Sequence, residues 1–301
     1  MKKQNFDHLL PELSIQHKLF ADEKERISSI KESQLKYEEK GLDYVIQTNR
    51  QNLRLEHLKS LARNEIRIIH VMSFTSEYAC EIISQGAVEL GYKAYTNVEK
   101  VRRIGMAYYE TEHKSDLVEQ YFDIARKTQE DFRQAFEPIG SPLDTLRCML
   151  DEIWPQGAHL QTLFGKKMFV GLSRMVEPNT TFLAHHDIFA DDAPETIESE
   201  SIISQFGANI YIQMPEVGGE LLMWHKNMTT AEFDLKRNAE YGINIDALPC
   251  PDIVVKPKTG DLLIFDSHKL HAVSSPRDRS RLALSFFIAY RGDNQPLTFW
   301  S

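Results

Sequence analysis

Two side chains that are two residues apart constrain this chain more than any other feature. His185 and Asp187 lie in residues 180–189, a segment that lacks Gly and Pro and is rich in β-branched and aromatic residues. This composition predicts a strand. Because residues i and i+2 of a strand point to the same face, His185 and Asp187 are expected to share one site. His186 is expected to face the other way and to have a structural role.

A third side chain of the same chemistry must come from another strand. The apolar run 262–265 predicts a buried strand, and it is followed by His268 and His271. We choose His271, because it opens a His-Ala-Val segment and is followed ten positions later by Arg281. Two histidines and one carboxylate can hold a single Fe(II) on one face, with the opposite positions open for a co-substrate and O2. His268 is interpreted as a surface or supporting residue.

Arg281 begins a further predicted strand, 281–288, whose other residues are mostly apolar. A guanidinium in such a strand requires an anionic partner, because an unpaired buried charge is costly. Its planar fork of donors suits a carboxylate. Near an iron site, the far carboxylate of 2-oxoglutarate is the candidate partner.

Further motifs accompany these residues between about positions 168 and 291. Residues 260–265, His271 with the Ala-Val that follows, and Arg281 look like the C-terminal half of the Fe(II)/2-oxoglutarate-dependent dioxygenases. Residues 218–221, Gly-Gly-Glu-Leu, follow a predicted strand and resemble the hairpin between the ligand pairs in the prolyl-hydroxylase-like branch. The resemblance implies Fe(II), 2-oxoglutarate and O2 as cofactors and co-substrates, and a double-stranded β-helix (jelly-roll or cupin-like) core.

A narrower resemblance extends beyond that core. Segments 102–107, 142–146, 154–155 and 299–301 are similar to the radical halogenases and hydroxylases that act on free amino acids. The halogenases carry a small residue in place of the carboxylate ligand, which opens a coordination site for chloride. Because this chain has Asp187, the resemblance implies hydroxylation of a small-molecule substrate, a free amino acid.

Candidate substrate residues follow from the chemistry of an amino acid, whose carboxylate requires a cation and whose ammonium requires acceptors. Arg102 or Arg103 is a candidate carboxylate clamp, since a strand there would turn one of them inward; a surface pair is the alternative. Arg174, in the apolar segment 169–174, is a second candidate. Trp300 closes over the pocket if the narrower resemblance extends to the last residues; docking onto the core is the alternative.

The composition places limits on partners and location. The net charge of −9 over 301 residues argues against nucleic acid as a partner. No uninterrupted apolar run approaches the length that spans a membrane, and the polar N-terminus contains no secretory signal. The three cysteines contain no CxxC pair, which favours reduced thiols and a cytoplasmic location.

The order of predicted elements indicates an α+β fold in which helices flank the β core. Residues 1–60, dominated by Lys, Glu, Gln and Arg, form a predicted N-terminal helical extension with helices at about 20–39 and 50–62. It is interpreted as a solvated cover, with an interaction arm or a homodimer contact as the alternative. Residues 61–301 form the predicted catalytic domain. Its expected elements are a strand at 65–72, a helix from Thr75 or Ser76 to about Leu90, a strand at 101–109, helices at 116–136 and 143–153, and short strands from 167 onward.

Other functions stay open at this level. The same chemistry on an amino acid tethered to a carrier protein, or on another small metabolite, is one alternative. Desaturation or cyclisation in place of hydroxylation is another, which the ligands alone do not decide. A non-catalytic binding or sensing module on the same scaffold is the third. Loss of a ligand or of the arginine would mark such a module, and neither is lost here. The acidic run 191–200 is interpreted as a solvated loop, with a lid over the pocket as the alternative.

Overall fold

The computed structural model describes residues 37–94, 100–180, 182–237 and 240–301. Residues 39–301 form one compact unit. The predicted helix at about 20–39 and most of the predicted N-terminal extension lie outside the described residues. Within the described residues, no helix is both long and apolar enough to cross a membrane.

Two β-sheets form the centre of the unit. The large sheet has the strand order β1-β2-β12-β9-β14-β8-β4-β3, with β15 paired to β14 and β5 paired to β15. The smaller sheet has the order β11-β10-β13, and β6 pairs with β7 in a separate hairpin. The strand bounds are β1 Val45–Asn49, β2 Ile68–Met72, β3 Lys93–Ala94, β4 Val101–Ile104, β5 Ala158–Leu160, β6 Thr162–Leu163, β7 Lys166–Lys167, β8 Leu172–Val176, β9 Ser204–Gln213, β10 Leu221–Met223, β11 Ile253–Val255, β12 Leu262–Asp266, β13 His271–Val273, β14 Arg281–Tyr290 and β15 Leu297–Trp300.

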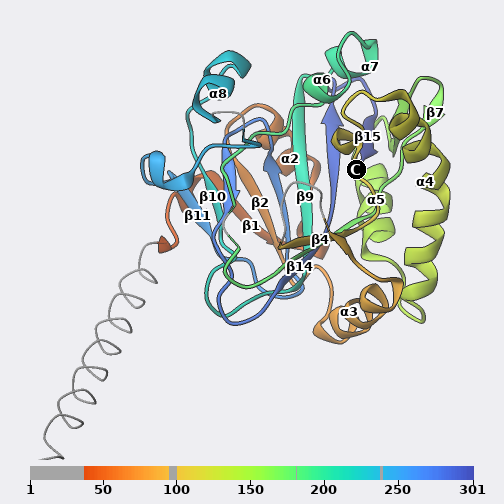
Figure 1. The fold of residues 1–301 in the computed structure, drawn as a ribbon, viewed down its shortest axis with the longest axis horizontal. Helices are drawn as coiled ribbons and strands as arrows, with labels where there is room; N and C mark the ends of the chain where they lie inside the picture. Colours follow the sequence, from red (N-terminus) through yellow and green to blue (C-terminus); the bar gives the residue numbers. More distant parts are fainter. Residues whose placement is uncertain (1–36, 95–99, 181, 238–239) are drawn as a thin grey trace, which may run out of the picture. The chain divides into compact units, whose positions relative to one another are not determined.

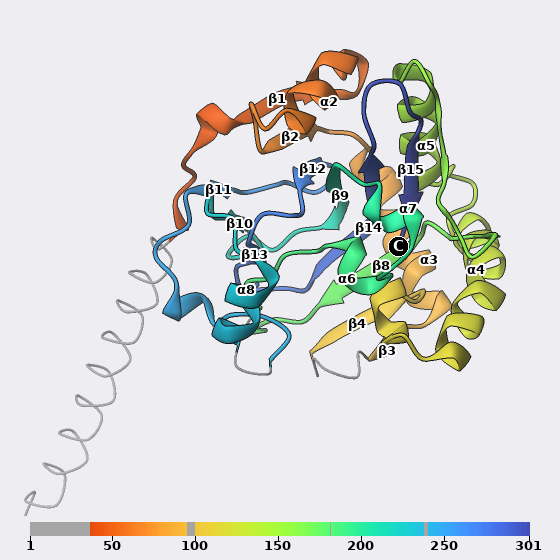
Figure 2. The same cartoon turned by 90° about the horizontal axis from the view of Figure 1, so that it is seen from above.

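Helices cover the outer face of the large sheet. Figures 1 and 2 show α3, α4 and α5 gathered on one side of it, with the sheet of β10, β11 and β13 on the other side. The α-helices are α2 Leu55–Ala62, α3 Glu77–Leu90, α4 Ser115–Ala135, α5 Pro142–Ile153, α6 Phe189–Asp192, α7 Ile197–Glu200 and α8 Thr230–Arg237. Short 3-10 turns are η2 Leu42–Tyr44, η3 Arg50–Asn52, η4 Tyr108–Thr111 and η5 Ile245–Ala247.

The two-residue period of β9 and β14 produces the two layers of the core. On β14, Leu282 and Leu284 belong to the cluster packed under the helices, whereas Ala283 belongs to the cluster between the two sheets. On β9, Ile210 and Tyr211 divide in the same way. Successive side chains of a strand point to opposite faces, so each strand serves both layers. The outcome is a sheet-rich α/β unit with facing sheets, as expected for a jelly-roll core.

The predicted helices are confirmed where local signals define them. The side chain of Ser76 accepts a hydrogen bond from the backbone N–H of Ala79 and caps α3. Pro142 occupies the first turn of α5, where its missing N–H has no cost. Helices α3 and α4 approach closely at Gly86, where a Cβ atom would lie 2.0 Å from the carbonyl oxygen of Ala135. A larger residue there would push the two helices apart.

Three expectations about strands and helices were wrong in part. Among the described residues of 180–189 there is no strand: Ala184 and His185 make isolated bridges, and α6 begins at Phe189. The strand expected at 101–109 ends at Ile104, before a glycine of positive φ and the turn η4. Inside the expected helical extension, β1 pairs in parallel with β2, and the helix expected from about 50 begins at Leu55. Long-range pairing overrides the local pattern in each segment.

Candidate metal centre and active-site cavity

His185, Asp187 and His271 come together at one point. One possible ligand atom from each lies within 4.8 Å of the others. The Nε2 atom of His271 is 3.4 Å from Oδ2 of Asp187, and the Nε2 atom of His185 is 3.9 Å from Oδ1. This is the donor set that the sequence predicts for a single metal ion.

Backbone hydrogen bonds position the three side chains. The N–H of His185 donates to the carbonyl of His271 at 2.9 Å, and the N–H of His271 donates back at 2.8 Å. The N–H of Asp187 donates to the carbonyl of Ser267 at 2.9 Å. The segment around Asp187 is therefore fixed to the turn between β12 and β13, although it is not itself a strand. The hydroxyl of Tyr241 accepts the N–H of Leu183 at 2.8 Å and supports the same segment.

The hydrogen bonds of the two rings define which nitrogen faces the centre. Nδ1 of His185 lies 3.0 Å from the carbonyl oxygen of Leu183, and Nδ1 of His271 lies 2.9 Å from that of Lys269. A carbonyl oxygen only accepts, so each Nδ1 carries the proton. Each Nε2 then presents a lone pair toward Asp187, the arrangement found in metal-ligating histidines.

The electrostatics of the site favour the ligating forms. Burial, and then the nearby His271, lower the pKa of His185 to about 4 against the opposing effect of Asp187. Burial alone would raise the pKa of Asp187, but the neighbouring His271 and His185 and the charge of Arg174 hold it well below its usual range. A neutral imidazole and an ionised carboxylate are the forms that bind a divalent metal.

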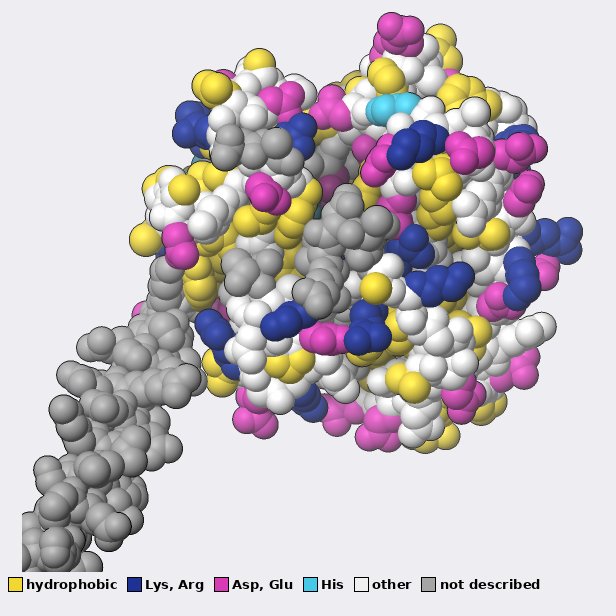
Figure 3. Space-filling view, viewed as in Figure 1, with side chains coloured by type: hydrophobic (Ala, Val, Ile, Leu, Met, Phe, Trp, Pro, Cys, Tyr) yellow, Lys and Arg dark blue, Asp and Glu magenta, His cyan; other side chains and the backbone are white. Residues whose placement is uncertain are grey.

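A cavity of about 690 Å³ surrounds the three side chains. Its floor is made by β8, β9 and β14, and parts of its rim come from α6 and α8. The surface is hollowed between α8 on one side and α6 and α7 on the other (Figure 3). The polar and charged side chains that contribute to its lining include Arg174, Asn209, Ser285, Arg281, Asp191, Asp192, Asp234 and Arg237.

Arg281 is a buried charged residue of this cavity whose guanidinium has no anionic partner among the described residues. It is 5% exposed at the start of β14, and its guanidinium lies 4.9 Å from the ring centroid of Tyr211. Its Nε atom is buried without a hydrogen-bond partner, and no ion pair joins it to another described residue. An arginine in this state fits a dicarboxylate such as 2-oxoglutarate, because a carboxylate would supply the missing acceptor.

The predicted substrate residues divide into two groups. Arg174, on β8, contributes to the lining of the cavity. Arg102 instead pairs with Glu177, and Arg103 pairs with Glu110; neither arginine belongs to the lining. The expectation that one of this pair turns into the pocket is therefore not met, because carboxylates on neighbouring segments satisfy both guanidinium groups.

Trp300 also lies outside the lining of the cavity. It is 1% exposed, and its ring packs 4.6 Å from that of Phe189 and 5.5 Å from that of Phe287. The next residue, Ser301, reaches the cavity instead. The alternative reading, a tryptophan docked onto the core, describes its position. Through Phe189, this ring supports α6.

Several lining residues were not identified from the sequence. Asn209 and Ser285 are cross-strand neighbours on β9 and β14, and the Ser285 hydroxyl is buried without a partner. Both residues lie at inward-facing positions of strands that the sequence predicts, so the two-residue alternation of those strands could have identified them. His186 is not part of the metal-site group, but it contributes to the lining of the same cavity, and its ring lies 4.3 Å from that of Phe233. Asp192 was included only within an acidic run, without a role of its own.

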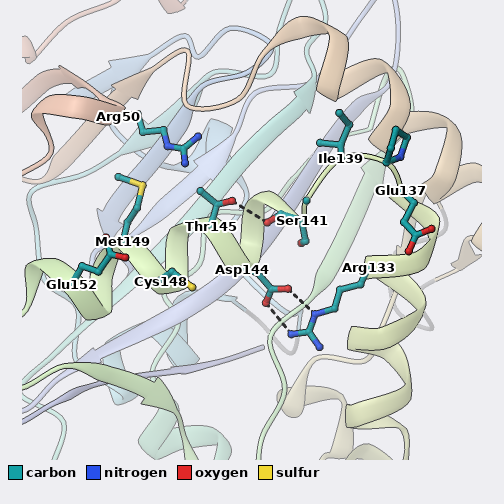
Figure 4. Close-up of a pocket in the computed structure, with 12 residues that line it drawn as sticks. Arg50, Arg133, Glu137, Ile139, Ser141, Asp144, Thr145, Cys148, Met149 and Glu152 are labelled. Atoms are coloured by element: carbon teal, nitrogen blue, oxygen red, sulfur yellow. Dashed lines mark hydrogen bonds and ion pairs between the residues drawn. The ribbon is translucent and has the colours of Figure 1, made fainter.

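A second cavity, of about 610 Å³, lies beside α5 and the end of α4 (Figure 4). Arg133 makes two hydrogen bonds with Asp144 across it, and the Thr145 hydroxyl donates to the carbonyl of Ser141. None of the three metal-site residues contributes to its lining. Because Arg133 and Asp144 already pair with each other, neither of these two charges requires a ligand of opposite charge in this cavity.

The donor set and the two-sheet core together define the class of mononuclear non-haem iron oxygenases. Residues 170–289 match the 2OG-Fe(II) oxygenase superfamily. Over this segment the chain resembles that superfamily, whose cofactor and co-substrate are Fe(II) and 2-oxoglutarate. The matched segment contains the three metal-site residues and Arg281.

Individual relatives agree with this family match. L-gamma-glutamyl-L-propargylglycine hydroxylase from Streptantibioticus cattleyicolor is 28% identical over 175 residues, which are 56% of this chain and 63% of the relative. The aligned region thus spans less than two thirds of that protein. A crystal structure of an N-substituted L-amino acid dioxygenase from Burkholderia ambifaria has a TM-score of 0.58 at 17% identity, covering 82% of this chain and 91% of that one. The same enzyme in complex with alpha-KG gives 0.56 at 16% identity, covering 82% and 90%. These two likenesses establish the fold.

Proposed function

We propose that this protein is an Fe(II)- and 2-oxoglutarate-dependent oxygenase that hydroxylates an unactivated C–H bond of an amino acid. One observation carries the proposal: a 2-His-1-carboxylate centre and an uncompensated buried arginine share a single cavity. His185, Asp187 and His271 would hold the iron, and Arg281 would bind the far carboxylate of 2-oxoglutarate.

The reaction balances without a further oxidant. Bound iron supplies the oxidation of a C–H bond, in which one O2 and one 2-oxoglutarate yield the alcohol, succinate and CO2. The residues of this chain position the reactants and exclude water. The carbonyl contacts of both imidazoles hold the ligand geometry, and the apolar walls of the cavity, including Leu172, Val176 and Phe265, keep it poor in water.

We consider two kinds of amino-acid substrate. A free amino acid is our first candidate, with Arg174 as the cation for its carboxylate. An amino acid whose α-nitrogen carries a substituent is the second candidate. It is supported by the names of the hydroxylase relative and of the dioxygenase neighbour.

The test is succinate release by the purified chain with Fe(II), 2-oxoglutarate and O2. The panel contains each common L-amino acid, its N-acetyl derivative and its γ-glutamyl dipeptide. Stimulation by one compound, with a product heavier by one oxygen atom, is the expected outcome. A product lighter by two hydrogens would indicate desaturation or cyclisation. Absence of both 2-oxoglutarate consumption and iron binding would leave the non-catalytic binding module.

Other expectations remain proposals. They include a double-stranded β-helix catalytic domain, which contains β1 and therefore begins before residue 61. A helical extension ahead of that domain, a cytoplasmic location and a homodimer contact are the others. A carrier-tethered substrate also stays an alternative. It would be indicated if succinate release rose only when a carrier protein bearing the aminoacyl group was added.

A further inference from the structure

Asp192 lines the active-site cavity, and the proposed function assigns it no role. It is the last residue of α6, it is partly buried, and it contributes to the cavity lining. Neither a hydrogen bond nor an ion pair joins it to any other described residue. A carboxylate at a partly buried position without a charged partner is unfavourable, because burial removes part of its hydration and no cation replaces it.

The other charged groups of the cavity do not compensate Asp192. Arg237 is paired with Asp234, with a nitrogen–oxygen distance of 2.7 Å. Arg281 is assigned to the co-substrate. The pKa of Asp192 is raised well above its usual range by burial, and then by the charges of Asp187 and Asp191; no positive charge lowers it. Asp192 therefore favours its protonated form as long as no cation lies beside it, and a cation at that position would stabilise the carboxylate.

The element that carries Asp192 is held firmly in place. The N–H of Phe189 donates to the side-chain oxygen of Gln205 at 2.9 Å, and the ring of Phe189 packs on Trp300. The next residue, Ala193, accepts a hydrogen bond from the hydroxyl of Ser199 at 2.6 Å. The residues on both sides of Asp192 thus make hydrogen bonds or packing contacts within the fold. The Asp192 carboxylate makes no hydrogen bond or ion pair with another described residue.

The position and surroundings of this carboxylate indicate the ligand that it would bind. α6 begins two residues after Asp187, so Asp192 is close in the chain to the metal centre. Aromatic rings, including those of Tyr109 and Phe287, line the same cavity. A carboxylate beside aromatic faces is a favourable environment for an organic cation, which gains both charge pairing and attraction to the rings.

We infer that Asp192 binds the ammonium group of the substrate. This inference rests on the proposed function, and it adds that the substrate presents a protonated amine to α6. For a free amino acid, this group is the α-ammonium or a side-chain amine; for a γ-glutamyl derivative, it is the ammonium of the glutamyl part. Asp192 is thereby a specificity residue, and Arg174 on the cavity floor is the candidate cation for the substrate carboxylate.

The experiment uses two small probes of equal length, n-butylammonium and n-butanol. Their dissociation constants are measured by saturation-transfer NMR on the full-length chain, first without metal and then with Mn(II) and 2-oxoglutarate. Wild type is compared with Asp192→Asn and with Asp192→Ser, which serves if the first variant does not fold. Glu200→Gln is the matched control, because it removes one negative charge from the same acidic run but lies outside the cavity lining.

The expected result is that wild type and Glu200→Gln prefer butylammonium over butanol. Either Asp192 variant should weaken butylammonium binding by about tenfold or more, the size of one charge-assisted hydrogen bond. Butanol binding should not change. Equal affinity for butylammonium in wild type and the Asp192 variants would overturn the inference, as would a wild type without preference for the cation. Because the first arm contains no metal, it decides the inference even if the succinate assay rejects the oxygenase function.

Discussion

Replacement of Arg281 by methionine tests the proposed co-substrate site most directly. Arg281 is 5% exposed, its Nε atom has no partner, and its guanidinium lies over the ring of Tyr211. Methionine retains most of the side-chain length and the apolar contact with that ring, but it removes the charge. The substitution should therefore affect 2-oxoglutarate binding and protein stability in different ways.

The expected loss of affinity is large. Removing one partner of a buried, hydrogen-bonded charge pair costs about 2–5 kcal/mol. This corresponds to a dissociation constant for 2-oxoglutarate that rises by about 30-fold to several-thousand-fold. The stability without 2-oxoglutarate should be unchanged or higher, because the guanidinium has no anionic partner among the described residues. If Arg281 belonged to a structural ion pair, its loss would instead destabilise the fold by about 3–5 kcal/mol.

Two measurements check these expectations. Calorimetric titration of 2-oxoglutarate into the Mn(II)-loaded chain gives the affinity, and urea unfolding of the metal-free chain gives the stability. Arg279→Met is the matched control: this arginine is two residues away and half exposed, and it donates to the carbonyl of Met214 outside the cavity. The reasoning is refuted if Arg281→Met binds 2-oxoglutarate as wild type does. A stability loss of several kcal/mol would show that the guanidinium has a structural role.

Further predictions concern the metal centre and one buried carboxylate. His271→Ala should weaken Mn(II) binding by more than the roughly 10- to 100-fold that loss of a supporting partner costs, whereas His268→Ala should not change it; the reverse order in titrations would exchange the two assignments. Asp261→Asn should destabilise the fold by about 1–3 kcal/mol at pH 7, because Oδ2 of Asp261 lies 2.7 Å from Nε2 of His70 and the carboxylate also accepts two backbone N–H groups. Burial opposes ionisation of Asp261, but these hydrogen bonds prevail and lower its pKa. A lowered folded-state pKa gives stability that is complete above the unfolded value of about 3.9 and is lost as the pH falls through the folded value. Urea unfolding at pH 7 and pH 3 should show the difference between wild type and variant shrinking in acid, and a difference independent of pH would contradict this account.

Local signals in the sequence were sufficient to predict several helices and the placement of two metal-site residues. The cap at Ser76 and the proline at the start of α5 marked helices that the structure contains. The two-residue separation of His185 and Asp187 placed both on one side of the backbone. This prediction held although residues 186–188 are not in a strand, because the hydrogen bonds with His271 and Ser267 keep the segment extended. Such features depend on covalent spacing and on nearest neighbours, which are written in the chain.

The partners of long charged side chains could not be obtained in this way. Arg102 and Arg174 were both candidates in the sequence. Arg102, on β4 next to the edge strand β3, pairs with Glu177, whereas Arg174 reaches the cavity from β8. The register of β8 against β4 and β14 decides this outcome. A shift by one residue would exchange the inward and outward sets.

Asp192 is a second charged residue whose surroundings could not be predicted from the sequence. Its sequence context is an acidic run, which is ordinarily a solvated loop. Only the packing of Phe189 on Trp300, residues more than a hundred positions apart, brings this carboxylate to the cavity wall. The sequence by itself determined the ligand types, their spacing and the helical cover, because these depend on local geometry. The tertiary structure decided which charges meet and which stay uncompensated, because that depends on strand register and on contacts between distant segments.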